Sequence, residues 1–289
     1  MLNPKKYPRT KRAYIKPKEP VTVVLSGGQD STTCLFWALM TYDGDVHCIT
    51  FDYGQRHSIE LTSAVEVVHY ARSKFPGRFI GHDIIPIPRV LQGTSPLVSD
   101  APLEQYKDHA SLPGGLEKTF VPMRNQFFLT VAANFAFVHG CSSLVTGVCQ
   151  EDSGGYPDCR DEFIRAFERT ASLGTFNAEA GFHDGLTVET PLMFLTKADS
   201  IRLAFTIPHA YTALALTHTA YDGVYPPTGK DHANLLREKG FAEAGVPDPL
   251  VLRAVDDGWM EMPNSENYGV GIVNRIKRDH RFPTPRRAS

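Results

Sequence analysis

The sequence predicts an α/β fold in which helices cover both faces of a parallel sheet, with a small helical C-terminal region. Runs rich in Val and Ile alternate with stretches of helical periodicity, the pattern of a parallel sheet joined by crossover helices. The strand-like runs lack a regularly polar face, as expected for strands buried on both sides. The first run ends in a glycine-rich turn that opens a helix. With 289 residues, 42% of them hydrophobic, the chain has enough apolar material for such a core.

The first part of the chain contains two strand–helix units. Residues 21–25 (VTVVL) form a strand-like run, and the helix expected at 31–41 follows directly after two glycines. Residues 46–51 (VHCITF) predict the second strand. From 58 to 74 the apolar residues recur at helical spacing, and a Pro-Gly pair ends that helix.

The alternation continues with less regular connections. Residues 79–87 predict a third strand, whereas 92–119 lack periodicity and contain clusters of Gly, Pro and Ser, which predicts a loop. A strongly apolar helix is expected at 125–138, a short buried strand at 143–147 and an amphipathic helix at 161–173. After these elements the pattern weakens into helical segments interrupted by proline.

Composition divides the chain into four segments. We expect a basic N-terminal tail (1–20), an α/β domain (21–204), a helical C-terminal region (205–274) and a basic C-terminal tail (275–289). The two ends hold 13 of the 30 Lys and Arg residues and two of the 32 acids, so the body between them has a net charge of −13. We consider two alternatives for the basic tails: they are solvated and lie on the acidic body, or they contact nucleic acid or an acidic partner protein.

Cysteine usage and hydropathy indicate the compartment. The five cysteines are odd in number and include no C-x-x-C pair, which argues against a disulfide framework and a cysteine-based zinc site. No apolar run is long enough to cross a membrane, and no apolar segment follows the basic N-terminus as in a secretory signal. We therefore expect a cytoplasmic protein without a membrane partner.

Residues 26–31 (SGGQDS) are typical of a phosphate-binding loop. Glycines let backbone N–H groups approach a ligand closely, and the first turn of the next helix offers further donors and a positive dipole end. Ser26 and Ser31 add hydroxyls, and Asp30 beside phosphates suggests a Mg²⁺ ion between them. The loop is neither a Walker loop nor G-x-G-x-x-G. It resembles the S-G-G-x-D-S pyrophosphate loop of ATP pyrophosphatases, which split ATP between the α and β phosphates; an ordinary tight turn is the alternative.

Four further stretches fall at strand ends or loops, where parallel α/β sheets place their ligands. These stretches are 51–57 (FDYGQRH), 120–125 (FVPMRN), 147–160 (GVCQEDSGGYPDCR) and 190–197 (TPLMFLTK). Together with SGGQDSTTCL they resemble the QueC family over about residues 21–250. The resemblance implies a Rossmann-like fold of the adenine nucleotide alpha hydrolase type and a homodimer.

The resemblance also implies an activity in queuosine biosynthesis. Members of the family are ATP-dependent carbon–nitrogen ligases that act on 7-carboxy-7-deazaguanine and ammonia. Adenylation of the carboxylate turns AMP into the leaving group, and ammonia gives the amide. A second ATP then gives the nitrile, 7-cyano-7-deazaguanine. The expected partners are therefore ATP, Mg²⁺, the deazaguanine carboxylate and ammonia or another amine, and no glutaminase module accompanies the chain.

Site residues follow from the family motifs and the chemistry of their side chains. The expected catalytic residues are Asp30, Ser31, Arg124 and Lys197, the two cations as charge clamps at the α-phosphate. ATP is expected to contact Ser26, Gly27, Gly28, Gln29, Asp30 and Ser31, with adenine at the backbone of Thr50 and Phe51 and Mg²⁺ on Asp30. The flat deazaguanine needs an aromatic face and a hydrogen-bonding edge, supplied by Tyr53, Gln55, Arg56, Asp152, Tyr156, Asp158 and Arg160. His57 is either a structural hydrogen-bonder or a base, and Cys159 is expected to be a buried structural thiol.

The chain departs from the family pattern at two places. Ala220, Thr228, Asp231 and Asn234 stand where the resemblance implies four zinc-binding cysteines, so we expect no structural zinc and a turn held by hydrogen bonds and packing. Met123 stands where the family pattern P-G-R-N has glycine, which adds a side chain near the expected ligand.

These departures leave two alternatives to the nitrile-forming ligase. A zinc-less QueC-like paralogue would conjugate the activated deazaguanine to a protein or another amine, in antiphage defence. A non-catalytic module would bind the nucleotide or deazaguanine without turnover, although the presence of Asp30, Ser31, Arg124 and Lys197 argues against it.

Overall fold

A computed structural model describes residues 18–53, 59–78, 80–87, 120–150, 156–175, 185–219, 223–227 and 229–283. Most of the N-terminal tail and the loop expected at 92–119 lie outside the described residues. The described part contains one five-stranded sheet with the order β3-β2-β1-β4-β5, and every pairing is parallel. The predicted α/β class with a parallel sheet is confirmed.

The strands place β1 at the centre of the sheet. Their bounds are β1 (Val21–Val24), β2 (Val46–Asp52), β3 (Ile80–Pro86), β4 (Ser143–Val145) and β5 (Thr187–Glu189). The register aligns Val21 with Val46 on one side and with Ser143 on the other. The chain adds strands outward on one side of β1 and then returns to its other side. The carboxyl ends of β1 and β4 therefore form the topological switch point, where such sheets bind ligands.

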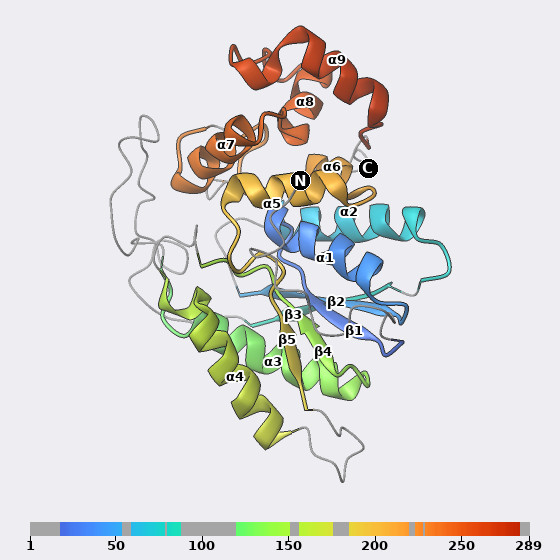
Figure 1. The fold of residues 1–289 in the computed structure, drawn as a ribbon, viewed down its shortest axis with the longest axis vertical. Coiled ribbons are helices and arrows are strands. Elements are labelled where there is room, and N and C mark those ends of the chain that lie inside the picture. The colour runs from blue at the N-terminus through green and yellow to red at the C-terminus, as the bar shows by residue number, and fades with distance from the viewer. Residues whose placement is uncertain are drawn as a thin grey trace.

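Helices cover both faces of the sheet (Figure 1). One face carries α1 (Gln29–Thr41), α2 (Ile59–Lys74), α5 (Lys197–Thr206) and α6 (Ala210–Ala213), and the opposite face carries α3 (Arg124–Val138) and α4 (Asp161–Gly174). The remaining helices, α7 (His232–Ala244), α8 (Pro249–Asp256) and α9 (Val270–Asp279), stack beyond α5 and α6. Short 3-10 turns occur at Pro157–Cys159, Leu214–Leu216 and Glu266–Tyr268.

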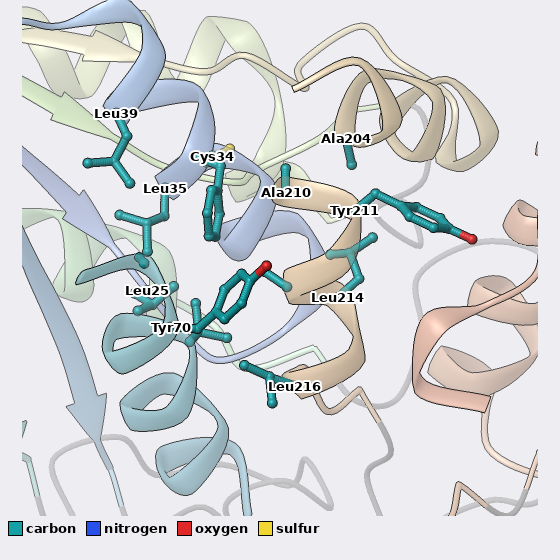
Figure 2. Packing of buried hydrophobic residues seen from close by; sticks show 14 of the residues in the cluster. Leu25, Cys34, Leu35, Leu39, Tyr70, Ala204, Ala210, Tyr211, Leu214 and Leu216 are labelled. Carbon is teal, nitrogen blue, oxygen red and sulfur yellow. The ribbon is translucent and has the colours of Figure 1, made fainter. Parts of the chain in front are cut away.

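Alternation along the strands divides the apolar side chains between two cores. Val21 and Val23 join the core under α1, α2 and the C-terminal helices, whereas Ile49 and Leu144 join the core under α3 and α4. Figure 2 shows the first core, where side chains from the end of β1 and from α1, α2 and α6 meet. Burial on both faces explains why the strands have no regularly polar side.

The predicted elements agree with the structure to within about two residues at most ends. The differences are β5 and α5, which the sequence analysis did not anticipate. The boundary expected between 204 and 205 falls inside α5, and the C-terminal tail expected from 275 begins inside α9. In α9, Lys277 pairs with Asp256 of α8, so this cation belongs to the folded part of the molecule. None of the helices in the described ranges combines the length and apolarity that a membrane crossing requires.

Candidate nucleotide-binding site

The loop between β1 and α1 is closed by its own serines. The Ser26 amide donates to Ser31 Oγ at 3.1 Å, and the Gly28 amide donates to Ser26 Oγ at 3.3 Å. The Ser31 hydroxyl lies 3.2 Å from the Gly28 carbonyl, to which it donates. Gly28 is the N-cap of α1 and supplies no side-chain acceptor. The first turn of α1 therefore retains the donor-rich, positively polarised end that binds phosphates.

Two glycines are required for the close packing around this loop. Gly27 has φ +88°, and a Cβ there would lie 2.3 Å from the carbonyl oxygen of Glu60 in α2. Gly147, which follows β4, would place a Cβ 3.0 Å from the Ser31 amide nitrogen. The loop is thus held between the start of α2 and the end of β4, at the switch point of the sheet.

The structure brings together two residues that the sequence separates by 167 positions. Lys197 Nζ donates to Asp30 Oδ2 at 2.8 Å, and both side chains remain partly exposed. Lys197 is the first residue of α5, and the preceding Thr196 caps that helix by accepting a 3.1 Å hydrogen bond from the Asp199 amide. The predicted charge clamp and the predicted magnesium ligand therefore lie at the same end of the loop.

The donor set of this loop fits a Mg²⁺–triphosphate group. Asp30 supplies a hard carboxylate oxygen, which Mg²⁺ accepts as one of few protein ligands beside phosphate oxygens and water. The first turn of α1 supplies amide donors, and Lys197 supplies a cation. The carboxylate is accessible from solvent, with 30% of its side chain exposed, so a ligand can reach it.

Arg124 organises a second group at the carboxyl edge of the sheet. This first residue of α3 donates a hydrogen bond to the Tyr53 hydroxyl and interacts electrostatically with Glu60. Burial raises the pKa of Tyr53 to about 12, with a further contribution from Glu60, while Arg124 opposes the shift. Burial also raises the pKa of Glu60 to about 7, again opposed by Arg124. Glu60, whose carboxyl has a pKa raised to about 7, thus has its backbone carbonyl beside Gly27 of the loop.

The YPDC motif packs against the start of α3. The Asn125 amide donates to Asp158 Oδ2 and its side chain donates to the Asp158 carbonyl, both at 3.3 Å. Burial raises the pKa of the Asp158 carboxyl, while the hydrogen bond from the Asn125 amide and the charge of Arg124 lower it. Cys159 accepts a hydrogen bond from Asn125 Nδ2, and burial raises its pKa to about 12. This is the environment expected for an unreactive structural thiol.

The end of β2 is held by side-chain contacts within the protein. Thr50 Oγ1 donates to the Leu25 carbonyl at 2.6 Å and lies 2.8 Å from His82 Nε2. Phe51 stacks on Phe128 of α3 with ring centroids 4.5 Å apart. Both side chains are buried, so the adenine contact predicted here belongs to the backbone and remains a prediction.

Met123, at the N-cap of α3, occupies a conformation that favours glycine. Its φ is +65° and ψ is 3°, in the left-handed region. The side chain is 65% exposed and therefore gains little from packing. The left-handed conformation explains why the family pattern has glycine at this position, because glycine adopts a positive φ without steric cost.

Two of the four positions that replace the family cysteines form a helix cap. Asp231 is the N-cap of α7: its Oδ1 accepts from the Asn234 amide at 2.8 Å, and its Oδ2 accepts from Asn234 Nδ2 at 3.0 Å. Ala220 and Thr228 lie outside the described residues. Across the described ranges, no three His, Cys, Asp or Glu side chains gather as a metal site would require. Absence of zinc remains a prediction, and this half of the turn is held by hydrogen bonds.

The structure describes only some of the remaining residues that were predicted to contact the substrate. Tyr156 is buried, and its ring lies 5.3 Å from that of Phe120. Arg160 is the exposed N-cap residue of α4. Gln55, Arg56, His57 and Asp152 lie outside the described residues. Their contacts with a substrate stay predictions.

Comparison with known proteins shows the family of this chain. The family described as "Queuosine biosynthesis protein QueC" matches residues 20–245. The chain belongs to the QueC family. A relative from Gloeobacter violaceus named 7-cyano-7-deazaguanine synthase is 49% identical over 230 residues, which are 79% of this chain and 94% of the relative. Another of that name, from Laribacter hongkongensis, is 45% identical over 242 residues, 83% of this chain and 97% of the relative. These names agree with the enzyme class expected from the sequence, an ATP-dependent carbon–nitrogen ligase.

Three residues that contact the residues of this candidate site were missed by the sequence analysis. Glu60 follows the FDYGQRH motif closely, but an acid in the first turn of a helix is also explained by the helix dipole. His218 donates its amide to the Gly27 carbonyl at 3.1 Å, a backbone contact without a sequence signature. Gly240 packs against Lys197, and a glycine within a helix does not by itself indicate a partner.

Proposed function

We propose that this QueC protein is an ATP-dependent ligase that converts 7-carboxy-7-deazaguanine and ammonia, by way of the amide, to 7-cyano-7-deazaguanine. The observation that carries the proposal is the pairing of Lys197 with Asp30 at the loop that follows β1. Family membership and the name of the relatives support the substrate class.

The proposed chemistry activates a carboxylate twice. A carboxylate oxygen attacks the α-phosphate of ATP, pyrophosphate leaves, and an acyl-adenylate forms. Ammonia then displaces AMP, which carries away that oxygen and leaves the amide. In the second round the amide oxygen attacks ATP, and loss of AMP and the nitrogen-bound protons gives the nitrile.

We assign the following roles to the residues of this site. Loop 26–31 and the first turn of α1 hold the β and γ phosphates, and the backbone amides there need no reorganisation during the reaction. Lys197 and Arg124 stabilise negative charge that develops at the α-phosphate. Mg²⁺ on Asp30 would supply charge neutralisation of the phosphates. Tyr53, Tyr156 and Asp158 present the aromatic faces and carboxylate that recognise the deazaguanine.

Product analysis by mass spectrometry tests the proposal. The full-length protein is incubated with Mg-ATP, ammonium and 7-carboxy-7-deazaguanine. The expected products are AMP, pyrophosphate and the nitrile. Asp30→Asn should lower the rate of AMP formation by about a hundredfold or more, whereas the exposed Glu261→Gln should leave it unchanged. Absence of AMP from the wild-type reaction would contradict the proposed function.

A second outcome would favour the alternative acceptor. AMP formation without amide or nitrile would mean that another amine receives the activated deazaguanine. Intact-mass measurement of candidate partner proteins from the same cells would then identify the conjugate. The lost zinc-cysteine pattern motivates this arm of the experiment.

A further inference from the structure

Helix α7 is connected to the proposed ATP site through two of its residues, which lie one turn apart. Arg237 and Gly240 are three residues apart in α7 and therefore lie on one side of the helix. Each connects, through a short chain of contacts, to a different part of the loop that follows β1. The two chains of contacts are independent observations.

The first connection begins at the buried Arg237 guanidinium. Its Nε and Nη2 donate to the Asp248 carboxylate at 2.6 and 2.9 Å, and Nη2 also donates to the Leu214 carbonyl at 3.2 Å. Its Nη1 donates to the hydroxyls of Thr217 and Thr219 at 2.8 and 2.9 Å. All five N–H donors of Arg237 are thus used, which fixes the side chain in one orientation.

The two threonines flank the residue that holds the loop. Between Thr217 and Thr219, the His218 amide donates to the Gly27 carbonyl at 3.1 Å. The His218 carbonyl lies 3.7 Å from the position that a Cβ of Gly28 would occupy. Arg237 therefore fixes the segment 217–219, and this segment fixes the glycine pair that is to face phosphates.

The second connection depends on the missing side chain of Gly240. A Cβ at this position would lie 2.4 Å from Lys197 Cγ, 3.1 Å from Lys197 Cβ and 3.0 Å from Ile201 Cδ1. Only glycine allows α7 to approach α5 this closely. The lysine that passes over Gly240 ends with its Nζ 2.8 Å from Asp30.

We propose that α7 is the positioning element of the ATP site, with Arg237 fixing the phosphate loop through residues 217–219 and Gly240 fixing the path of Lys197. The proposal rests on the proposed function and assigns a role to the region after the family's zinc turn. Asp231 and Asn234 cap α7 where the family pattern has cysteines, and Asp248 caps α8 while pairing with Arg237. The helix is therefore anchored at both the turn and the buried ion pair.

Gly240→Ala tests the second connection, with Gly271→Ala as the matched control. Gly271 lies within α9, and a Cβ there would meet nothing within 4 Å. In Gly240→Ala, kcat for AMP formation should fall by about tenfold to a hundredfold because Lys197 is displaced. The KM for ATP should change by less than about threefold, since the lysine acts on charge that develops in the transition state. Equal activities of the two variants, or a parallel loss in both, would overturn this connection.

Thr219→Val tests the first connection without removing the buried guanidinium. Loss of one hydroxyl should weaken binding of a non-hydrolysable ATP analogue with Mg²⁺, measured by calorimetry, by about fivefold. Thr219→Ser should restore the affinity because it keeps the acceptor for Arg237 Nη1. An unchanged affinity in Thr219→Val, or no rescue by serine, would overturn this connection.

Analogue binding also separates this proposal from the proposed function. If the wild type binds the analogue but forms no AMP with 7-carboxy-7-deazaguanine, the substrate is wrong while the comparison of Thr219 variants still decides the role of α7. If the wild type does not bind the analogue, the positioning role is overturned as well.

Discussion

Two single residues near the candidate site lower the stability of the fold, Met123 through its backbone conformation and Glu60 through the burial of its carboxyl. Met123 adopts a left-handed backbone that costs a non-glycine residue about 1 kcal/mol or more. The backbone of Glu60 lies beside the loop that joins β1 to α1, and burial raises the pKa of its carboxyl to about 7. Such features persist where the surrounding structure holds them, and they concentrate at functional sites.

Met123→Gly should stabilise the protein. Relief of the left-handed strain should raise the free energy of unfolding by about 0.5–1 kcal/mol, because the exposed methionine side chain contributes little packing. Urea denaturation measures the change. Met123→Ala keeps the Cβ and should show no such gain; an equal gain in both variants would mean that the backbone conformation is not the cause.

Glu60→Gln should flatten the dependence of stability on pH. The folded-state pKa of Glu60, about 7, lies above the ordinary value of 4.5, so between these values the folded chain binds more protons than the unfolded chain. Stability of the wild type therefore falls as pH rises through this interval, by on the order of 1 kcal/mol. Glutamine removes the titration, and the variant should gain relative to wild type from pH 5 to pH 8. Chemical denaturation at both pH values checks this. The prediction would be contradicted if the difference in free energy of unfolding between variant and wild type were the same at pH 5 and pH 8.

At the residue scale, sequence motifs selected two residues that the structure places in contact, whereas residues that depend on packing carried no sequence signal. Asp30 and Lys197 were both selected from motifs, and the structure brings them within 2.8 Å. Gly240 was not selected, because its role depends on how closely α5 and α7 approach. Glu60 was missed because its burial depends on neighbours that are distant in sequence.

At the scale of elements, strands with a clear apolar run were predictable and the edge strand β5 was not. The strands β1 and β2 carry apolar runs with recognisable ends, whereas β5 has only three residues and includes Glu189. Such a short edge strand is defined by its pairing with β4 and not by its own composition. The start of α5 did carry a signal, a threonine cap with an acid three residues later, that was not used.

The capped turn before α7 predicts stability without a metal. Asp231→Ala should lower the free energy of unfolding by about 1 kcal/mol, because the first turn of α7 loses its cap. Asp231→Ser retains an acceptor and should recover most of that loss. Thermal unfolding of the wild type with and without a chelator should give the same midpoint; a lower midpoint with chelator would mean that a metal holds the turn.

At the scale of the molecule, the C-terminal helices join the same folding unit as the sheet. Leu214 and Phe241 belong to the core that also contains Val21 and Leu35, so α7 and the 3-10 turn Leu214–Leu216 pack on the layer that covers the sheet. The buried Arg237–Asp248 pair lies within this shared region. The loop that joins β1 to α1 therefore contacts the sheet on one side and the segment that leads to the C-terminal helices on the other.

Arg237→Met should destabilise the whole molecule. Removal of one partner leaves the buried Asp248 carboxylate uncompensated, which costs about 3–5 kcal/mol. Lys277→Met removes a partly exposed pair with Asp256 and should cost less than about 1 kcal/mol. Urea denaturation followed by circular dichroism compares the two variants. A similar, small decrease in the free energy of unfolding of both would show that the buried pair does not anchor the fold.

Transfer of heavy oxygen from substrate to AMP tests the central claim most directly. The protein is supplied with Mg-ATP, ammonium and 7-carboxy-7-deazaguanine labelled with ¹⁸O in its carboxylate, and the AMP is analysed by mass spectrometry. Adenylation of the carboxylate and then of the amide predicts that each AMP carries one ¹⁸O atom and that the nitrile carries none. AMP without ¹⁸O would contradict activation of the substrate by adenylation at the loop that joins β1 to α1.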